Sequence, residues 1–324
     1  MFLLAFLAAA GLGWLILTPF GPETETFVDV APGSSTALIG RQLEAAGVVR
    51  SRFGFDLLRF WKRGTLRAGE YRFDHPAPAP EIYARIARGD VFTKQLTIPE
   101  GSNIFDIAAR VEEAGFGTRQ EFLEAATERI SLVADMDPGA KSLEGYLFPD
   151  TYRFQRKTTP AQIATAMVRR FRAVAGQLGL KENVHEVVTV ASLVERETAV
   201  DRERPLVASV MMNRLGKNMP LMTDPAVIYG LELQGRWRGV LTKSELESNT
   251  VYNTYLHEGL PPGPVANPGV RSLRAAMEPA QTNYFYFVAA GTNAQGESLF
   301  STTLDEHDKQ VAEYRRALKK AGER

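Results

Sequence analysis

Ala191-Ser192-Leu193-Val194-Glu195-Arg196-Glu197-Thr198-Ala199 has the spacing of an interior helix, yet it contains two carboxylates. The apolar residues upstream, from Val187 to Val194, leave no broad polar face. At about 100° per residue, Glu197 falls near Val190 and Leu193. A carboxylate on a buried helix must be paired, neutral or directed into a cleft. The pattern therefore predicts either a salt-bridged structural glutamate or a general acid whose pKa is raised by apolar surroundings.

Composition excludes several classes of function. The chain has 324 residues, 44% of them hydrophobic, which is enough for two domains and a membrane segment. Basic and acidic residues are equal in number, 38 each, so we expect no nucleic-acid partner bound through its phosphates. With no cysteine there are no disulfides, thiolate metal sites or cysteine nucleophiles. No cofactor or metal is predicted, because the histidines lack ligand spacing: His75, His185, His257 and His307.

The N-terminal run from Met1 to Phe20 carries no charged side chain. About 20 apolar residues suffice to span a bilayer core as a helix, so we expect residues 1–20 to form a retained transmembrane anchor. A cleavable signal peptide is the alternative, although the run has neither a basic n-region nor a clear cleavage site. Flanking charges do not specify the orientation, since the first ones are Glu23 and Glu25.

Two segments resemble each other at a constant offset, Phe27 to Gly47 and Gln95 to Gly115. Each is typical of a strand, a Gly-Ser turn, an amphipathic helix and a glycine stop. A second helix near 52–62 and a strand at 68–73 complete a strand-helix-helix-strand unit. This unit resembles a LysM-like module, a fold associated with glycan binding, and a simple spacer is the alternative. We expect an α+β protein with the LysM-like module at 27–94 and a larger mixed α/β catalytic domain at 95–324.

Three further segments combine polar, aromatic and loop-forming residues. Glu144 to Tyr152 is a dense polar-aromatic turn. In Thr223 to Gly230, an aspartate precedes a proline; Asp224 could cap the following helix or take part in catalysis. Asn249 to Gly269 contains a long loop rich in proline and glycine, and such loops inside a compact domain tend to be functional.

These motifs, together with Tyr284 to Val288, closely resemble the endolytic murein transglycosylases (the MltG/YceG-like family), and the resemblance covers nearly the whole chain. It implies a single-pass inner-membrane protein with its bulk on the periplasmic side. It also implies cleavage of the β-1,4 bond from N-acetylmuramic acid to N-acetylglucosamine within peptidoglycan glycan strands, leaving 1,6-anhydromuramoyl ends. Termination of nascent strands, with peptidoglycan synthases as partners, would follow.

The family's catalytic glutamate is the second carboxylate of a Glu-x-Glu-Thr motif, which corresponds to Glu197. Glu195 is then expected to support it. Met222 departs from the glutamine that is frequent in the family, which puts in doubt a sugar contact at that position. Five residues are predicted to contact substrate, with packing or capping as the alternative: Asn253, Tyr255, Asp224, Glu144 and Tyr146.

One acid–base carboxylate suffices for a lytic transglycosylase, because the sugar's own C6 hydroxyl is the nucleophile. Glycosidases generally need two carboxylates. Two other functions stay open. One is a hydrolytic muramidase with Asp224 as the second carboxylate. The other is a membrane-tethered cell-wall binding or scaffold protein with a degenerate site.

Overall fold

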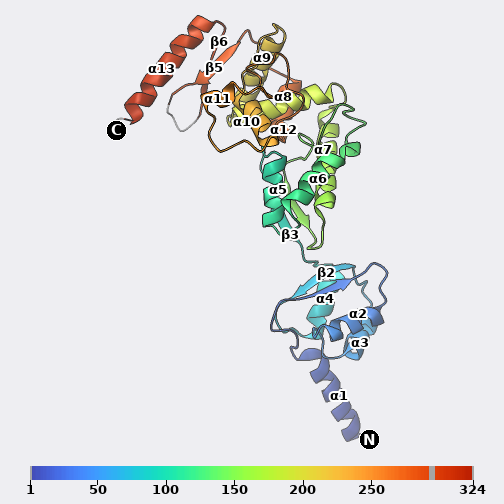
Figure 1. Cartoon of the computed structure of the whole chain (residues 1–324). Coiled ribbons are helices and arrows are strands. Elements are labelled where there is room, and N and C mark those ends of the chain that lie inside the picture. The colour runs from blue at the N-terminus through green and yellow to red at the C-terminus, as the bar shows by residue number, and fades with distance from the viewer. Residues whose placement is uncertain (1, 292–295, 323–324) are drawn as a thin grey trace. The chain divides into compact units, whose positions relative to one another are not determined.

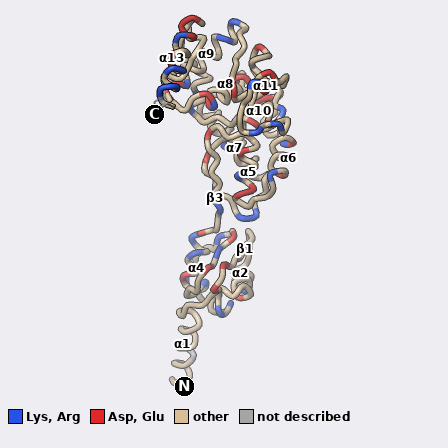
Figure 2. The backbone as a smooth tube through the Cα atoms, turned by 60° about the vertical axis from the view of Figure 1, so that its left-hand side comes forward, with Lys and Arg blue, Asp and Glu red and all other residues tan. Residues whose placement is uncertain are grey.

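The computed structural model describes residues 2–291 and 296–322, and the chain divides into two compact units (Figure 1). Basic and acidic residues are interspersed along the chain, in keeping with their equal numbers (Figure 2). Unit 1 comprises Met1–Lys94 with Arg153–Arg156, and unit 2 comprises Gln95–Tyr152 with Lys157–Arg324.

Unit 1 is a two-stranded antiparallel sheet packed against helices. β1 (Thr26–Val30) pairs with β2 (Gly69–Phe73), with Val28 opposite Tyr71. The connection holds α2 (Thr36–Ala45) and α3 (Arg52–Lys62), and α4 (Ala79–Arg88) follows β2. The sheet and these helices enclose one apolar core, whose largest fully buried side chains are Tyr71, Phe55, Ile39, Leu43 and Ile86.

The prediction of a transmembrane anchor is wrong. Helix α1 (Phe2–Leu17) has 16 residues and is about 24 Å long, less than the roughly 30 Å of a bilayer core. Within residues 2–291 and 296–322, no helix has both the length and the apolar character needed to cross a membrane. Pro19 accounts for the early end, because the residue before a proline is driven out of the helical region. Phe20 then forms an isolated β-bridge with Ala77.

The end of α1 packs onto the core of unit 1, to which it belongs. Ile16 is partly buried against the core of that unit. The guanidinium of Arg50 lies 4.1 Å from the ring centroid of Trp14 and 4.7 Å from that of Phe20. The predicted single-pass placement in an inner membrane is therefore contradicted together with the anchor.

Unit 2 is mainly helical, and the buried helix α8 (Val184–Glu197) lies at its centre. It packs against α9 (Arg204–Leu215), α10 (Asp224–Leu233) and α12 (Val270–Met277) (Figure 1). Within this unit β5 (Tyr286–Ala289) pairs with β6 (Ser298–Ser301). β3 (Lys94–Thr97) and β4 (Thr151–Phe154) also pair with each other. The other helices are α5 (Ile104–Glu113), α6 (Arg119–Glu128), η1 (Ile130–Leu132), α7 (Pro160–Leu178), η2 (Asp201–Glu203), α11 (Lys243–Leu246) and α13 (Leu304–Gly322).

Candidate active site

Glu197 is the last residue of α8 and lies in the wall of a cavity of about 330 Å³. The helix ends there because Thr198 adopts an extended backbone. Side chains that are distant in sequence complete the cavity. They come from α9, the following loop, the start of α10, the loop at 255, β5 and α13: Val210, Met211, Arg214, Leu221, Met222, Thr223, Asp224, Tyr255, Phe287 and His307.

The cavity changes the acidity of Glu197. Burial raises the pKa of its carboxyl, the negative charge of Asp224 raises it further, and the positive charge of Arg214 opposes both; the pKa is about 7. A substantial share of the molecules therefore carries a protonated Glu197 near neutral pH. A carboxyl group with a pKa close to the working pH can both donate and accept a proton during one reaction.

Asp224 and Tyr255 lie in the same cavity as Glu197 and are bonded to each other. The Tyr255 hydroxyl donates to Asp224 Oδ1 at 2.7 Å. Burial and this carboxylate raise the pKa of Tyr255, so the phenol stays protonated. Asp224 does not cap α10, since it is the first residue of that helix and Thr223 occupies the N-cap position. The side chain of Asp224 is therefore available to the cavity.

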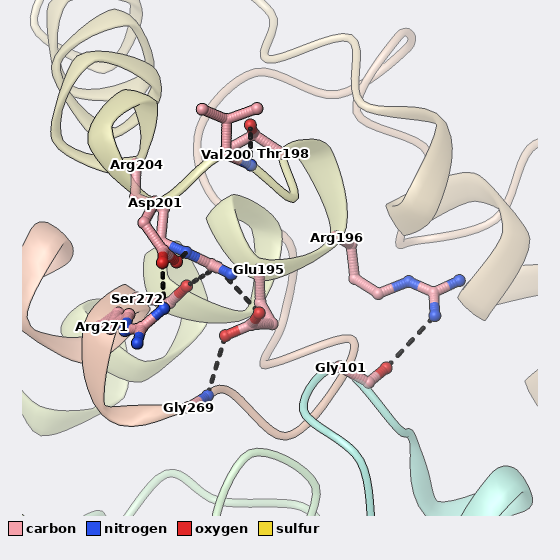
Figure 3. Close-up of polar contacts among 10 residues, drawn as sticks. All are labelled: Gly101, Glu195, Arg196, Thr198, Val200, Asp201, Arg204, Gly269, Arg271 and Ser272. Atoms are coloured by element: carbon pink, nitrogen blue, oxygen red, sulfur yellow. Dashed lines mark hydrogen bonds and ion pairs between the residues drawn. The ribbon is translucent and has the colours of Figure 1, made fainter. Parts of the chain in front are cut away.

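Glu195 belongs to a different, buried network (Figure 3). Arg204 Nη1 donates to Glu195 Oε1 at 2.8 Å, and the backbone N–H of Gly269 donates to Glu195 Oε2 at 2.9 Å. Both partners of the ion pair are almost fully buried. Arg204 Nη1 also donates to Ser272 Oγ at 2.5 Å. This network joins the end of α8 to the start of α9 and to α12, so both carboxylate oxygens of Glu195 have structural partners.

Asn253 is fully buried and does not line the cavity of Glu197. Its amide nitrogen donates to the carbonyls of Leu246 and Ser248, at 2.9 and 2.7 Å. Its amide oxygen accepts from Tyr255 N at 3.0 Å. Asn253 thus shapes the loop that presents Tyr255 to the cavity.

Glu144 and Tyr146 also lie outside the cavity of Glu197. Ile104 N donates to Glu144 Oε2 at 2.9 Å, and Asn267 Nδ2 donates to Glu144 Oε1 at 2.6 Å. Burial raises the pKa of Glu144 to about 8. The Tyr146 hydroxyl donates to Asp137 Oδ2 at 2.5 Å in the core. These contacts favour structural roles for both residues.

Sequence reasoning missed two ionisable residues of the cavity, Arg214 and His307. Arg214 follows Val207 and Val210 at positions i+7 and i+4 on one face of α9, so an ionisable residue on an apolar helical face was the available signal. His307 lies on the solvated C-terminal helix α13, where no local pattern marks it. In the described part of the chain, no group of three or more His, Asp or Glu side chains could hold a metal ion.

The chain is similar to proteins of one kind over most of its length. The family model described as the YceG-like family matches residues 28–313. A Bacillus subtilis (strain 168) protein named endolytic murein transglycosylase is 32% identical, over 93% of this chain and 89% of its own length. A Streptococcus pneumoniae (strain D39) protein of the same name is 29% identical, over 92% of this chain and 60% of its own length. The crystal structure of a yceG-like protein from Listeria monocytogenes superposes with a TM-score of 0.58 at 32% identity, covering 89% of this chain and 99% of that one.

Proposed function

This chain belongs to the YceG-like family, and we propose that Glu197 carries out, as acid and then as base, the reaction for which its relatives are named. The protein is an enzyme of peptidoglycan, a lytic transglycosylase. The observation that carries the assignment to Glu197 is its place in a cavity, with a pKa of about 7 and no ion-pair partner among the described residues.

The proposed reaction needs only one carboxyl group. Protonated Glu197 gives its proton to the glycosidic oxygen between N-acetylmuramic acid and N-acetylglucosamine, and the C1–O bond breaks. The Glu197 carboxylate then takes the proton of the C6 hydroxyl as O6 bonds to C1. The products are a 1,6-anhydromuramoyl end and a free 4-hydroxyl, no water is consumed, and Glu197 is again protonated.

A hydrolytic muramidase is a second candidate, because Asp224 lines the same cavity and could act as the second carboxylate. The hydrogen bond from Tyr255 to Asp224 Oδ1 favours a fixed electrostatic role for Asp224 over activation of a water. Product mass separates the two reactions, since an anhydro end is lighter than a reducing end by one water.

The test is digestion of purified, uncrosslinked glycan strands with wild type and with Glu197→Gln, followed by mass spectrometry. Wild type should release anhydro-ended fragments, and Glu197→Gln should be slower by roughly 10²- to 10⁴-fold. Glu186→Gln is the matched control, because Glu186 is an exposed glutamate in the first turn of the same helix. Release of anhydro ends by Glu197→Gln at the wild-type rate would remove Glu197 from the mechanism.

Unit 1 is proposed to bind glycan. A shallow cavity of about 440 Å³ lies between α2 and α3 and includes Arg59 and Phe60 in its lining. Phe60 and Trp61 are 69% and 83% exposed, and exposed aromatic rings suit the apolar faces of sugars. Retention of Glu197→Gln on sacculi should fall when Phe60 is replaced by Ala. Unchanged retention would favour the spacer role.

Termination of nascent strands beside peptidoglycan synthases is the proposed cellular setting, because a cut inside a growing strand ends its elongation. Glycan strands made in cells that carry only Glu197→Gln should then be longer than those of the wild type. An unchanged strand-length distribution would argue against this setting.

A further inference from the structure

Arg214 holds its guanidinium in one fixed orientation at the edge of the active-site cavity. Nε donates to the carbonyl of Phe285 at 2.7 Å, and Nη1 donates to the carbonyls of Leu221 and Pro220 at 2.8 and 3.3 Å. These carbonyls come from two separate segments, the loop after α9 and the approach to β5. Three N–H groups of the fork are therefore committed to backbone, and the group cannot turn freely.

The remaining nitrogen, Nη2, has no hydrogen-bond partner among the residues that the structure describes, although Arg214 lines the cavity. Within the same residues, no carboxylate lies in ion-pair distance of Arg214. A largely buried cation that forms no ion pair is costly, although its charge acts on Glu197 from a distance, and burial lowers the pKa of this guanidinium. An arginine held in this way is suited to an acceptor that arrives with the substrate.

The chemistry of the reaction limits which group of the substrate could accept a hydrogen bond from Arg214 Nη2. Positive charge develops at C1 of the sugar as the glycosidic bond breaks, so a nearby free cation would oppose the reaction. The cation is tolerable when it is bound to an oxygen that carries negative partial charge. A guanidinium fork suits planar acyl oxygens, and a muramoyl unit carries two acyl groups, the N-acetyl at C2 and the lactyl at C3.

We propose that Arg214 is a substrate-binding residue whose Nη2 donates to an acyl oxygen of the muramoyl unit whose glycosidic bond is broken with the proton of Glu197. The contact places the sugar ring in front of Glu197. This inference rests on the proposed function.

The surroundings of Arg214 support this placement. Its guanidinium lies 5.3 Å from the ring centroid of Tyr286. Tyr286 in turn stacks on His307, with centroids 5.2 Å apart and ring planes inclined by 23°. A ring of β5 thus lies beside the arginine, and a ring of α13 stacks on it in turn. In this arrangement the C-terminal hairpin and helix are part of the binding site.

The test compares kcat/KM of wild type and Arg214→Gln on three substrates: native glycan strands, chemically de-N-acetylated strands, and strands stripped of stem peptide, which leaves a free lactyl carboxylate. On native strands we expect a loss of roughly 10- to 100-fold, the range for one charge-assisted hydrogen bond. If the N-acetyl group is the acceptor, this loss should shrink toward onefold on de-N-acetylated strands. If the lactyl group is the acceptor, the loss should grow on peptide-stripped strands.

Arg172→Gln is the matched control. Arg172 also binds a backbone carbonyl, with Nε and Nη2 donating to Leu132 at 3.0 and 2.7 Å, but it lies outside the cavity. The kcat/KM of Arg172→Gln should stay at the wild-type value on all three substrates. Arg214→Lys, which keeps the charge and loses the fork, gives the same comparison if Arg214→Gln fails to fold, and its loss should be smaller.

An equal loss on all three substrates would overturn the assignment of Arg214, as would no loss on native strands. In the same experiment, the masses of the products released by the wild type show whether anhydro ends are formed. Absence of anhydro ends from wild type would mean that the proposed function fails. Anhydro ends with an equal loss would mean that only the role of Arg214 fails.

Discussion

Glu195 and Glu197 are separated by one residue in the last turn of α8, yet their carboxylates lie in different environments. Glu195 accepts from Arg204 and from the N–H of Gly269 in a buried network (Figure 3), whereas Glu197 faces the cavity of Asp224 and Tyr255. Side chains two positions apart on a helix point in directions that differ by about 200°. One turn can therefore hold a glutamate in a structural contact and another in a reactive cavity. This difference in direction gives Glu195 a structural role and leaves Glu197 for the reaction, a distinction that the sequence pattern alone does not make.

Glu195→Gln and Glu197→Gln should have opposite effects on stability and activity. Glu195→Gln removes the closer and more deeply buried of the two acids that bind Arg204, leaving Asp201 Oδ1 at 3.3 Å, which costs about 3 kcal/mol of unfolding free energy. Glu197→Gln should change that free energy by less than about 1 kcal/mol while it removes activity. Urea unfolding and strand digestion of both variants measure the contrast. Equal destabilisation by the two variants would contradict the separation of roles.

The pH dependence of kcat/KM should report Glu197. Because the acid must be protonated and its pKa is about 7, activity should fall tenfold per pH unit above that value. Asp224→Asn removes the charge that raises this pKa, so the descending limb should move to lower pH.

Arg214→Gln removes the charge that lowers the pKa of Glu197, so its descending limb should move to higher pH. Tyr255 and His307 also face the cavity and are unchanged in both variants. Rate profiles between pH 5 and pH 9 measure the limbs. Shifts in the same direction for Asp224→Asn and Arg214→Gln would show that another group sets the limb.

Gly145→Ala should be strongly destabilising. Gly145 has φ +86°, and an added Cβ would lie 2.5 Å from Pro264 Cγ and 2.7 Å from Val188 Cγ1. We expect a loss above about 3 kcal/mol from the combined steric and backbone strain. Gly179→Ala is the control, because its φ is +74° but nothing lies within 4 Å of the added carbon. Gly179→Ala should lose about 1 kcal/mol of unfolding free energy. The difference between the two variants, measured by urea unfolding, then isolates the steric contact of residue 145 with Pro264 and Val188.

Glu144→Gln should alter the pH dependence of stability. Burial raises the folded-state pKa of Glu144 to about 8, above an unfolded value of about 4.3. The stability that the neutral carboxyl contributes is complete below the unfolded pKa and is lost as pH rises toward 8. Wild type should therefore lose more stability than Glu144→Gln between pH 5 and pH 8.5.

At pH 5, Glu144→Gln should be the less stable protein by about 1–3 kcal/mol, since one of the two N–H donors from Ile104 and Asn267 loses its acceptor. The gap should narrow as the pH rises. A gap that is constant or widens with pH would contradict the raised pKa of Glu144.

Local signals in the sequence were sufficient for much of the secondary structure. The sequence predicts a helix near 52–62 and a strand at 68–73, and α3 (Arg52–Lys62), capped by Ser51, and β2 (Gly69–Phe73) have these limits to within one residue. The prediction of a membrane span at 1–20 is wrong because a count of apolar residues ignores Pro19, which ends α1 at Leu17.

The sequence by itself determined the helix that carries Glu195 and Glu197, because helical periodicity depends only on neighbouring residues. Only the tertiary structure decided that Glu195 meets Arg204 and that Glu197 shares a cavity with Arg214 and His307. The physical reason is that burial and charge act through space. The pKa of Glu197 depends on side chains from α9 and α10, whose distance from it is set by packing and not by position along the chain.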